Sequence, residues 1–221
     1  MYSGNVTNSW TSLQPNSQRT PVVFIVEDDE SMRESINSLI RSAGWKAKAF
    51  GSALDFLSYP RTAGPNCLVL DINLPEFSGL DLQMRVAGER TEMPIIFITG
   101  SGDVAMAVRA MKAGAIEFLI KPFGDDVLLE AIQQAITRSQ TTIDAAAEML
   151  VLQGRLASLN RREREVMTLV ITGLLNKQVA GELGLSEITV KAYRGRAMKK
   201  MKARSFAELV NMAASLRLVA G

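Results

Sequence analysis

Histidine is absent from this chain of 221 residues, and cysteine occurs once, at Cys67. The absence of histidine excludes Ser-His-Asp catalysis, and together with the single cysteine it argues against a structural zinc site. One cysteine also excludes an internal disulfide, so Cys67, which lies in a predicted strand, is interpreted as a small core residue. Any catalysis or metal binding must therefore use other side chains.

Long apolar runs are missing as well. No segment is long enough to span a bilayer and no secretory signal is visible, so we expect a cytoplasmic protein with no membrane partner. Hydrophobic residues nevertheless make up 47% of the chain, which is ample for packed cores. The length allows one or two domains.

A net charge of +2 conceals an uneven distribution of charged residues. Residues 1–140 contain 12 basic and 16 acidic residues, whereas residues 141–221 contain 13 basic and 7 acidic ones. Seven of those basic residues and one acid lie between Glu187 and Arg204. A solvated surface often carries such an imbalance, but this concentration favours a nucleic-acid partner for the C-terminal part.

The chain changes character along its length. Residues 1–20 are polar without an apolar period, which predicts a disordered tail. Between residues 21 and 138 strand and helix patterns alternate, with a last helix over 125–138. The predicted strands are residues 22–27, 46–50, 67–71, 95–99 and 116–120. This alternation predicts an α/β doubly wound parallel sheet, flavodoxin-like, and the half-polar second strand fits an edge, which favours the order 2-1-3-4-5.

Helical patterns dominate the remainder. Residues 139–158 are predicted to form a linker that continues the preceding helix, and their sparse apolar positions leave a weak dimer seam open as an alternative. Residues 159–221 are predicted to form an all-α domain of four helices, the second and third being a short helix over 177–183 and a basic helix over 187–202. The cap positions are Asn160 with Glu163, Asn176, Ser186 and the terminating Gly184. A tight glycine turn before a basic helix is typical of a helix-turn-helix.

Three acidic residues follow two of the predicted strands. Glu27 and Asp28 come after the first apolar run, and Asp71 ends the third strand. Ligands of parallel sheets bind beyond the carboxyl ends of the strands, so these carboxylates should converge. Clustered like charges are costly unless a cation neutralises them or one carboxylate takes up a proton. Oxygen-only ligands suit Mg²⁺, and a carboxylate beside Mg²⁺ can attack phosphorus.

Two further residues at strand ends complete a known pattern. Thr99 ends the fourth strand and Lys121 the fifth, so a hydroxyl and an ammonium should face Asp71. With these residues the chain resembles a response-regulator receiver domain over residues 21–138. The matching positions are Glu27-Asp28, Asp71, Leu74-Pro75, Gly79, Thr99 and Lys121-Pro122-Phe123.

The receiver resemblance implies a role for each of these residues. Asp71 would be the phosphoacceptor, and Thr99, Lys121 and the switch aromatic Phe118 would sense the phosphoryl group. Mg²⁺ would be held by Asp28, Asp71, the backbone carbonyl of Asn73 and Glu27. The family usually has Asp at the position of Glu27, so its longer side chain is expected to reach the metal through a water. Lys121-Pro122 would be cis.

The C-terminal part resembles the LuxR-type helix-turn-helix over residues 159–217. The matching stretches begin at Leu159, Gly173 and Leu185, and Tyr193 stands where the family usually has histidine. The domain order resembles the FixJ and NarL subfamilies, with FixJ-like regulators closest. Val190, Ala197 and Met201 share one helical face and are interpreted as core.

DNA contacts are predicted for another face of the basic helix and for the start of the short helix before it. We assign Lys191 and Arg194 to the major groove. Contacts to phosphates are assigned to Asn176, Lys177, Thr189 and Arg196. For Lys199, Lys200, Lys202 and Arg204, solvated surface charge is the competing interpretation.

The combined patterns predict a two-component transcription regulator. A partner histidine kinase would phosphorylate Asp71, because the chain has no histidine to carry the group. The face made of residues 103–113, 116–120 and 125–138 would then dimerise and place two helix-turn-helix domains on double-stranded promoter DNA, with RNA polymerase as a further partner. The chain would catalyse only its own phosphoryl transfer.

Two rival functions differ in class. An Mg²⁺-dependent phosphatase with an aspartyl intermediate would need a general acid close after Asp71, and Asn73, two residues on, cannot serve. A DNA-binding protein with a purely structural receiver would not need the complete set of acids, threonine and lysine. An Asp at a strand end, an aromatic or a lysine is ordinary by itself, so the prediction depends on their combination.

Overall fold

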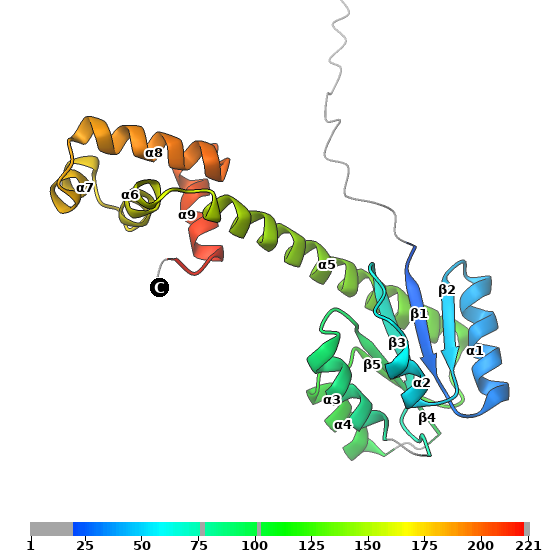
Figure 1. The fold of residues 1–221 in the computed structure, drawn as a ribbon. Coiled ribbons are helices and arrows are strands. Elements are labelled where there is room, and N and C mark those ends of the chain that lie inside the picture. The colour runs from blue at the N-terminus through cyan, green and yellow to red at the C-terminus, as the bar shows by residue number, and fades with distance from the viewer. Residues whose placement is uncertain (1–19, 76–77, 101–102, 219–221) are drawn as a thin grey trace, which may run out of the picture. The chain divides into compact units, whose positions relative to one another are not determined.

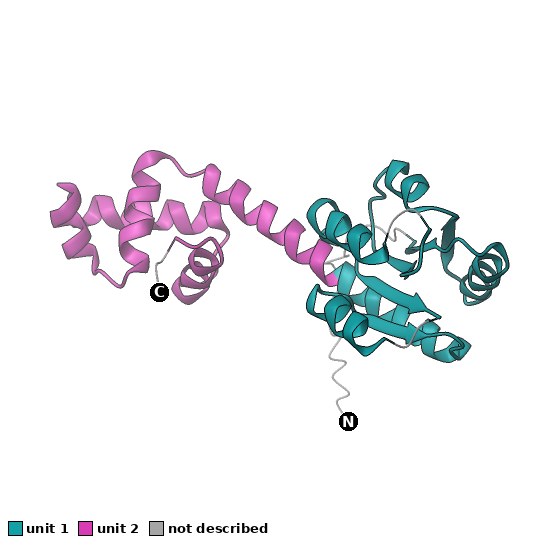
Figure 2. Cartoon of the chain, turned by 90° about the horizontal axis from the view of Figure 1, so that it is seen from below, with its two compact units in different colours: residues 1–140 teal, residues 141–221 magenta. Residues whose placement is uncertain are grey.

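A computed structural model describes residues 20–75, 78–100 and 103–218. The tail predicted to be disordered therefore lies outside the described residues, apart from Thr20. The chain divides into two compact units, residues 1–140 and 141–221 (Figure 2). Within the described part, no helix is both long enough and apolar enough to cross a membrane.

The first unit contains a five-stranded parallel sheet in the order β2-β1-β3-β4-β5, which confirms the predicted topology (Figure 1). Its strands are β1 (Val22–Val26), β2 (Lys46–Phe50), β3 (Asn66–Asp71), β4 (Ile95–Thr99) and β5 (Glu117–Ile120). The register aligns the strand ends, because Val26 pairs with Leu70 and Thr99 pairs with Ile120. The residues that follow these strands therefore meet at one edge of the sheet.

Helices cover both faces of this sheet. They are α1 (Glu30–Ser42), α2 (Ala53–Ser58), α3 (Gly79–Glu89), α4 (Val104–Lys112) and the first part of α5 (Asp125–Ala157). One buried cluster joins Phe24 and Val26 of β1 to α2, α3 and α4, while Val23 and Ile25 face a second cluster with α1 and α5. The alternation follows from the two-residue period of a strand. Cys67 is fully buried in the second cluster, as expected for a core residue, and burial raises the pKa of its thiol.

Two α1 boundaries follow from local signals. Asp29 caps α1 by accepting a hydrogen bond from the backbone N–H of Met32 at 2.7 Å. Gly44 ends the helix region with a φ of 89°, a conformation that favours glycine.

α5 is continuous through residue 157, so most of the stretch 139–158 continues the preceding helix as predicted. The alternative of a dimer seam on this stretch stays a prediction.

The second unit adds α6 (Arg161–Ile171), α7 (Asn176–Leu183), α8 (Glu187–Met201) and α9 (Phe206–Ser215) around its own buried cluster. Val190, Ala197 and Met201 of α8 are fully buried, as their shared face predicted. The expected capping box of Asn160 and Glu163 starts α6.

The prediction that Asn176 caps α7 is wrong by one position. Asn176 is the first residue of the helix, and Leu175 precedes it as the N-cap residue without a side-chain cap. The backbone N–H of Leu175 is instead satisfied by Oε1 of Gln178 at 2.8 Å. Gly184 ends α7 in the left-handed conformation, with a φ of 64°, as predicted.

Candidate functional site

The predicted acidic site forms at the carboxyl edge of the sheet. One carboxylate oxygen each from Glu27, Asp28 and Asp71 lies within 4.8 Å of the other two. Glu27 and Asp71 are buried, with 1% and 5% of their surface exposed, whereas Asp28 is exposed. We call these three residues the acidic crevice. The donor set consists only of oxygens, which fits a hard cation such as Mg²⁺.

Lys121 provides the positive charge inside this crevice. Its Nζ donates to Oε2 of Glu27 and to Oδ2 of Asp71, both at 2.7 Å. Burial tends to lower the pKa of Lys121, but hydrogen bonds and attraction to the two carboxylates outweigh it and raise the pKa. Burial raises the pKa of Glu27, although the contact with Lys121 opposes that change. One ammonium for three carboxylates leaves the site negative and attractive to a cation. The Lys121-Pro122 bond is cis, as the resemblance implied.

Asn73 links Asp71 to Thr99. Its backbone N–H donates to Oδ1 of Asp71 at 2.8 Å, and its side-chain amide donates to the hydroxyl of Thr99 at 3.2 Å. Sequence reasoning used only the backbone carbonyl of Asn73 and missed this side-chain contact. The structure thus brings Asn73 and the buried Thr99 to the crevice. Phe118 is half-buried against the cluster that contains Phe97.

Gly79 lets α3 approach the end of β3. A Cβ at this position would lie 2.6 Å from the backbone oxygen of Asp71 and 2.8 Å from the Cα of Ile72. The N–H of Gly79 donates to the carbonyl of Ile72 at 3.0 Å. Glycine here therefore reflects close backbone contact next to the crevice.

Arg33 is a residue that sequence reasoning missed. It lies in α1, and its Nη1 donates to the carbonyl of Glu27 at 2.9 Å and to that of Asp28 at 3.1 Å. A sequence signal exists, because a cation near the N-terminus of a helix is disfavoured by the helix dipole. Its presence there calls for a compensating contact.

The predicted DNA-contact residues lie at the N-terminal end of α7 and in α8. Lys177 and Lys191 are exposed, whereas Thr189 is half-buried with its hydroxyl 2.8 Å from that of Ser186. Nη1 of Arg194 donates to Oδ1 of Asn176 at 3.3 Å, and its guanidinium lies 4.4 Å from the ring centre of Phe206. Arg194 is therefore already ordered by protein contacts.

A buried carboxylate holds α6 to α8. Glu163, only 1% exposed, accepts from Nζ of Lys200 at 2.6 Å and lies 3.6 Å from Nε of Arg196. The hydrogen bond from Lys200 is the main cause that lowers the pKa of Glu163. The Arg196 guanidinium also lies 4.5 Å from the ring centre of Tyr193. Lys200 is thus more than a solvated surface charge, a role that sequence reasoning did not find.

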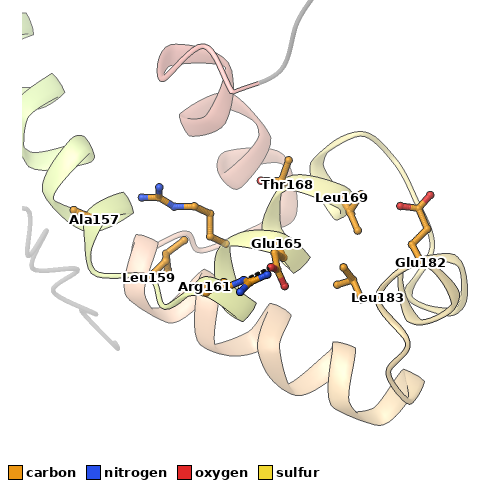
Figure 3. A pocket seen from close by; sticks show the side chains of 9 residues that line it. Ala157, Leu159, Arg161, Glu165, Thr168, Leu169, Glu182 and Leu183 are labelled. Carbon is orange, nitrogen blue, oxygen red and sulfur yellow. Dashed lines mark hydrogen bonds and ion pairs between the residues drawn. The ribbon is translucent and has the colours of Figure 1, made fainter.

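Two hollows in the second unit differ in size. The larger, about 760 Å³, lies between α6, α7 and the end of α5 and contains none of the predicted site residues (Figure 3). It is lined by Ala157, Leu159, Arg161, Arg164, Glu165, Thr168, Leu169, Glu182 and Leu183. A smaller hollow of about 420 Å³ is lined partly by Asn176, Lys177 and Arg194. Three of the six predicted DNA-contact residues therefore line the smaller hollow.

Comparisons with known proteins match both parts of the chain. The family described as response regulator receiver domain matches residues 23–133, and the family described as bacterial regulatory proteins, LuxR family, matches residues 157–213. Nodulation protein W of Bradyrhizobium diazoefficiens is 51% identical over 199 residues, which cover 90% of this chain and 88% of that protein. The transcriptional regulatory protein FixJ of the same organism is 40% identical over 191 residues, which cover 86% of this chain and 93% of FixJ.

A solved structure extends this similarity to the fold. The response regulator StyR superposes with a TM-score of 0.78 at 45% identity, and the alignment covers 88% of this chain and 98% of StyR. The match spans the receiver and the helical part together.

Proposed function

This chain belongs to the two-component response regulators that join a receiver domain to a LuxR-type DNA-binding domain, and we propose that Asp71 is its phosphoacceptor. It is a transcription regulator, and the family implies dependence on phosphorylation. The observation that carries the proposal is the acidic crevice, in which Lys121 contacts both Glu27 and Asp71 at 2.7 Å. Beyond its own phosphoryl transfer we propose no enzymatic activity.

A partner histidine kinase supplies the phosphoryl group. A carboxylate oxygen of Asp71 attacks phosphorus, the bond from phosphorus to the kinase histidine breaks, and an acyl phosphate forms. Asp28, Asp71, the carbonyl of Asn73 and, through a water, Glu27 would hold Mg²⁺, and the bound cation would supply positive charge for the phosphoryl oxygens. Lys121 and Thr99 then donate to those oxygens.

The proposed output of the receiver is dimerisation. Apolar side chains are exposed on α4, on β5 and at the start of α5, where solvent-exposed large apolar residues favour a protein interface. They are Val104, Val108, Met111, Ile120 and Val127, with 75%, 45%, 44%, 50% and 45% of their surface exposed. Ile120 pairs with Thr99 in the sheet and directly precedes Lys121, which supports a link between this face and these two residues. We propose that phosphorylation changes this face so that it pairs with a second copy of the chain.

The second unit would bind double-stranded promoter DNA. Lys191 and Arg194 are proposed to read bases in the major groove, while Asn176, Lys177, Thr189 and Arg196 contact phosphates. RNA polymerase is a further proposed partner. Because the proposed target is DNA, we propose that the protein acts in the cytoplasm.

Beryllofluoride, a phosphoryl mimic, tests the central steps. Sedimentation of the full chain should show a larger mass with Mg²⁺ and beryllofluoride together than with either alone. The Asp71→Asn chain should keep the smaller mass under all conditions. An unchanged mass of the unaltered protein with both reagents would contradict dimerisation.

A further inference from the structure

Arg33 contacts the backbone of the acidic crevice and not its carboxylates. Its Nη1 donates to two consecutive carbonyls, those of Glu27 at 2.9 Å and Asp28 at 3.1 Å. These carbonyls lie in the segment between β1 and α1, where the chain leaves the sheet. The direction of the Glu27 and Asp28 side chains depends on the backbone conformation of this segment.

The same guanidinium packs against the next strand. A Cβ on Gly51, directly after β2, would lie 3.4 Å from Nη1 of Arg33 and 3.8 Å from its Cζ. The N–H of Glu27 donates to the carbonyl of Phe50, one residue earlier, at 3.2 Å. Arg33 therefore lies across the ends of β1 and β2 and is half-buried there.

We propose that Arg33 is a positioning residue for the cation site, holding the Glu27-Asp28 backbone so that both carboxylates face Asp71. The inference rests on the proposed function. A guanidinium can hold two acceptors at once with fixed geometry, which an ammonium on a flexible stem cannot do as well. Asp29 caps α1 in the same segment and fixes the start of the helix.

Geometry and charge predict opposite effects for the loss of Arg33. If Arg33 matters only as a positive charge near the carboxylates, its removal should tighten Mg²⁺ binding, because like charges repel. If Arg33 positions the backbone, its removal should weaken Mg²⁺ binding. Partners that orient metal ligands typically contribute ten- to one hundredfold in affinity, so we expect a loss on the order of tenfold.

The test is calorimetric titration of the full-length chain with Mg²⁺ alone. Arg33→Gln should bind Mg²⁺ on the order of tenfold more weakly, and Arg33→Lys, which keeps the charge, should also bind more weakly but by less. Arg41→Gln is the matched control, because Arg41 is an exposed arginine in the last turn of α1.

The outcomes separate the two levels of the proposal. Equal or tighter Mg²⁺ binding by a folded Arg33→Gln chain would overturn the role of Arg33 while leaving the metal site intact. A loss in Arg33→Gln with none in Arg33→Lys would show that an ammonium serves as well as the guanidinium and would overturn the proposed role of its fixed geometry. If the unaltered protein binds no Mg²⁺, the proposed metal site fails, and the role of Arg33 fails with it. Thermal unfolding of each variant identifies any that do not fold.

Discussion

The two units use buried charge in opposite proportions. In the acidic crevice one ammonium, that of Lys121, contacts two buried carboxylates, and a third carboxylate lies beside them. Between α6 and α8 one buried carboxylate, that of Glu163, is shared by Lys200 and Arg196. The first cluster keeps an excess of negative charge, and the second an excess of positive charge.

This difference in charge indicates that the acidic crevice is a binding site and that the Glu163 cluster is a structural support. Unbalanced carboxylates in a crevice are costly and are relieved by a cation. The buried carboxylate of Glu163 already has two cationic partners on α8, Lys200 and Arg196. Its charge is therefore satisfied within the protein, and no ligand is required. Of the remaining cations of α8, Lys191 and Lys199 are exposed and Arg194 is half-buried.

The largest effect is expected when the proposed nucleophile of the acidic crevice, Asp71, is replaced. Asp71→Asn should abolish Mg²⁺-dependent labelling of the chain by radiolabelled acetyl phosphate, because an amide cannot form the acyl phosphate. Asp81→Asn is the control, since Asp81 is an exposed acid in the first turn of α3. Undiminished labelling of Asp71→Asn would refute the assignment.

Much of this comparison could be anticipated from the order of residues alone. The strand order and the meeting of Glu27, Asp71, Thr99 and Lys121 follow from apolar runs that end in polar residues, because a parallel sheet aligns those ends. Helix boundaries set by Gly44, Asn160 and Gly184 were also predicted, since caps act locally.

Contacts between distant segments could not be anticipated in the same way. The Lys200–Glu163 pair joins residues 37 positions apart, and its formation depends on how α6 packs on α8. The contact of Arg33 with two carbonyls depends on the path of the segment after β1. Asn176 was misplaced because its side chain binds Arg194, 18 positions away, while Gln178 satisfies the local N–H.

The second prediction addresses the excess positive charge of α8. Lys191→Ala and Arg194→Ala should each cost about 1–3 kcal/mol in binding to a specific site and should relax sequence preference. Lys177→Ala should weaken binding to all sequences alike, because a phosphate contact carries no base information. Competition between specific and random duplex DNA measures both effects.

The contacts of Arg194 with Asn176 and Phe206 add a control to this experiment. Unfolding of Arg194→Ala must be measured beside its DNA binding, since the substitution also removes a cation–π contact. Lys191, which is exposed, provides the cleaner test. A change of preference in Lys177→Ala with none in Lys191→Ala and Arg194→Ala would reverse the proposed division of roles.

The third prediction ranks the acids of the crevice. Asp28→Ala should weaken Mg²⁺ binding by roughly tenfold or more, and Glu27→Ala by less, because Asp28 is the proposed direct ligand and Glu27 the water-mediated one. Glu27 is also engaged by Lys121, which reduces its availability to the metal. Equal losses in a calorimetric titration would reject this ranking.

The smallest effect is expected in the cluster of Glu163, Lys200 and Arg196. The pKa of Glu163 is lowered, chiefly by the hydrogen bond from Lys200, so its ionised form stabilises the folded second unit. That stabilisation is complete above the ordinary carboxyl pKa of 4.5 and is lost as pH falls through the lowered value. Glu163→Gln should therefore reduce the stability of residues 141–221 at neutral pH, and the difference from the unaltered fragment should shrink in acid.

Urea unfolding of that fragment, followed by helical circular dichroism at neutral and acidic pH, measures the difference. Glu165→Gln is the matched control, because Glu165 pairs with the exposed Arg161 and Arg162 and exposed pairs contribute little. A pH-independent loss in Glu163→Gln would mean that packing and capping, and not the charge shared by Lys200 and Arg196, hold α6 to α8. The interpretation of the Glu163 cluster as a satisfied charge that stabilises the second unit would then be wrong.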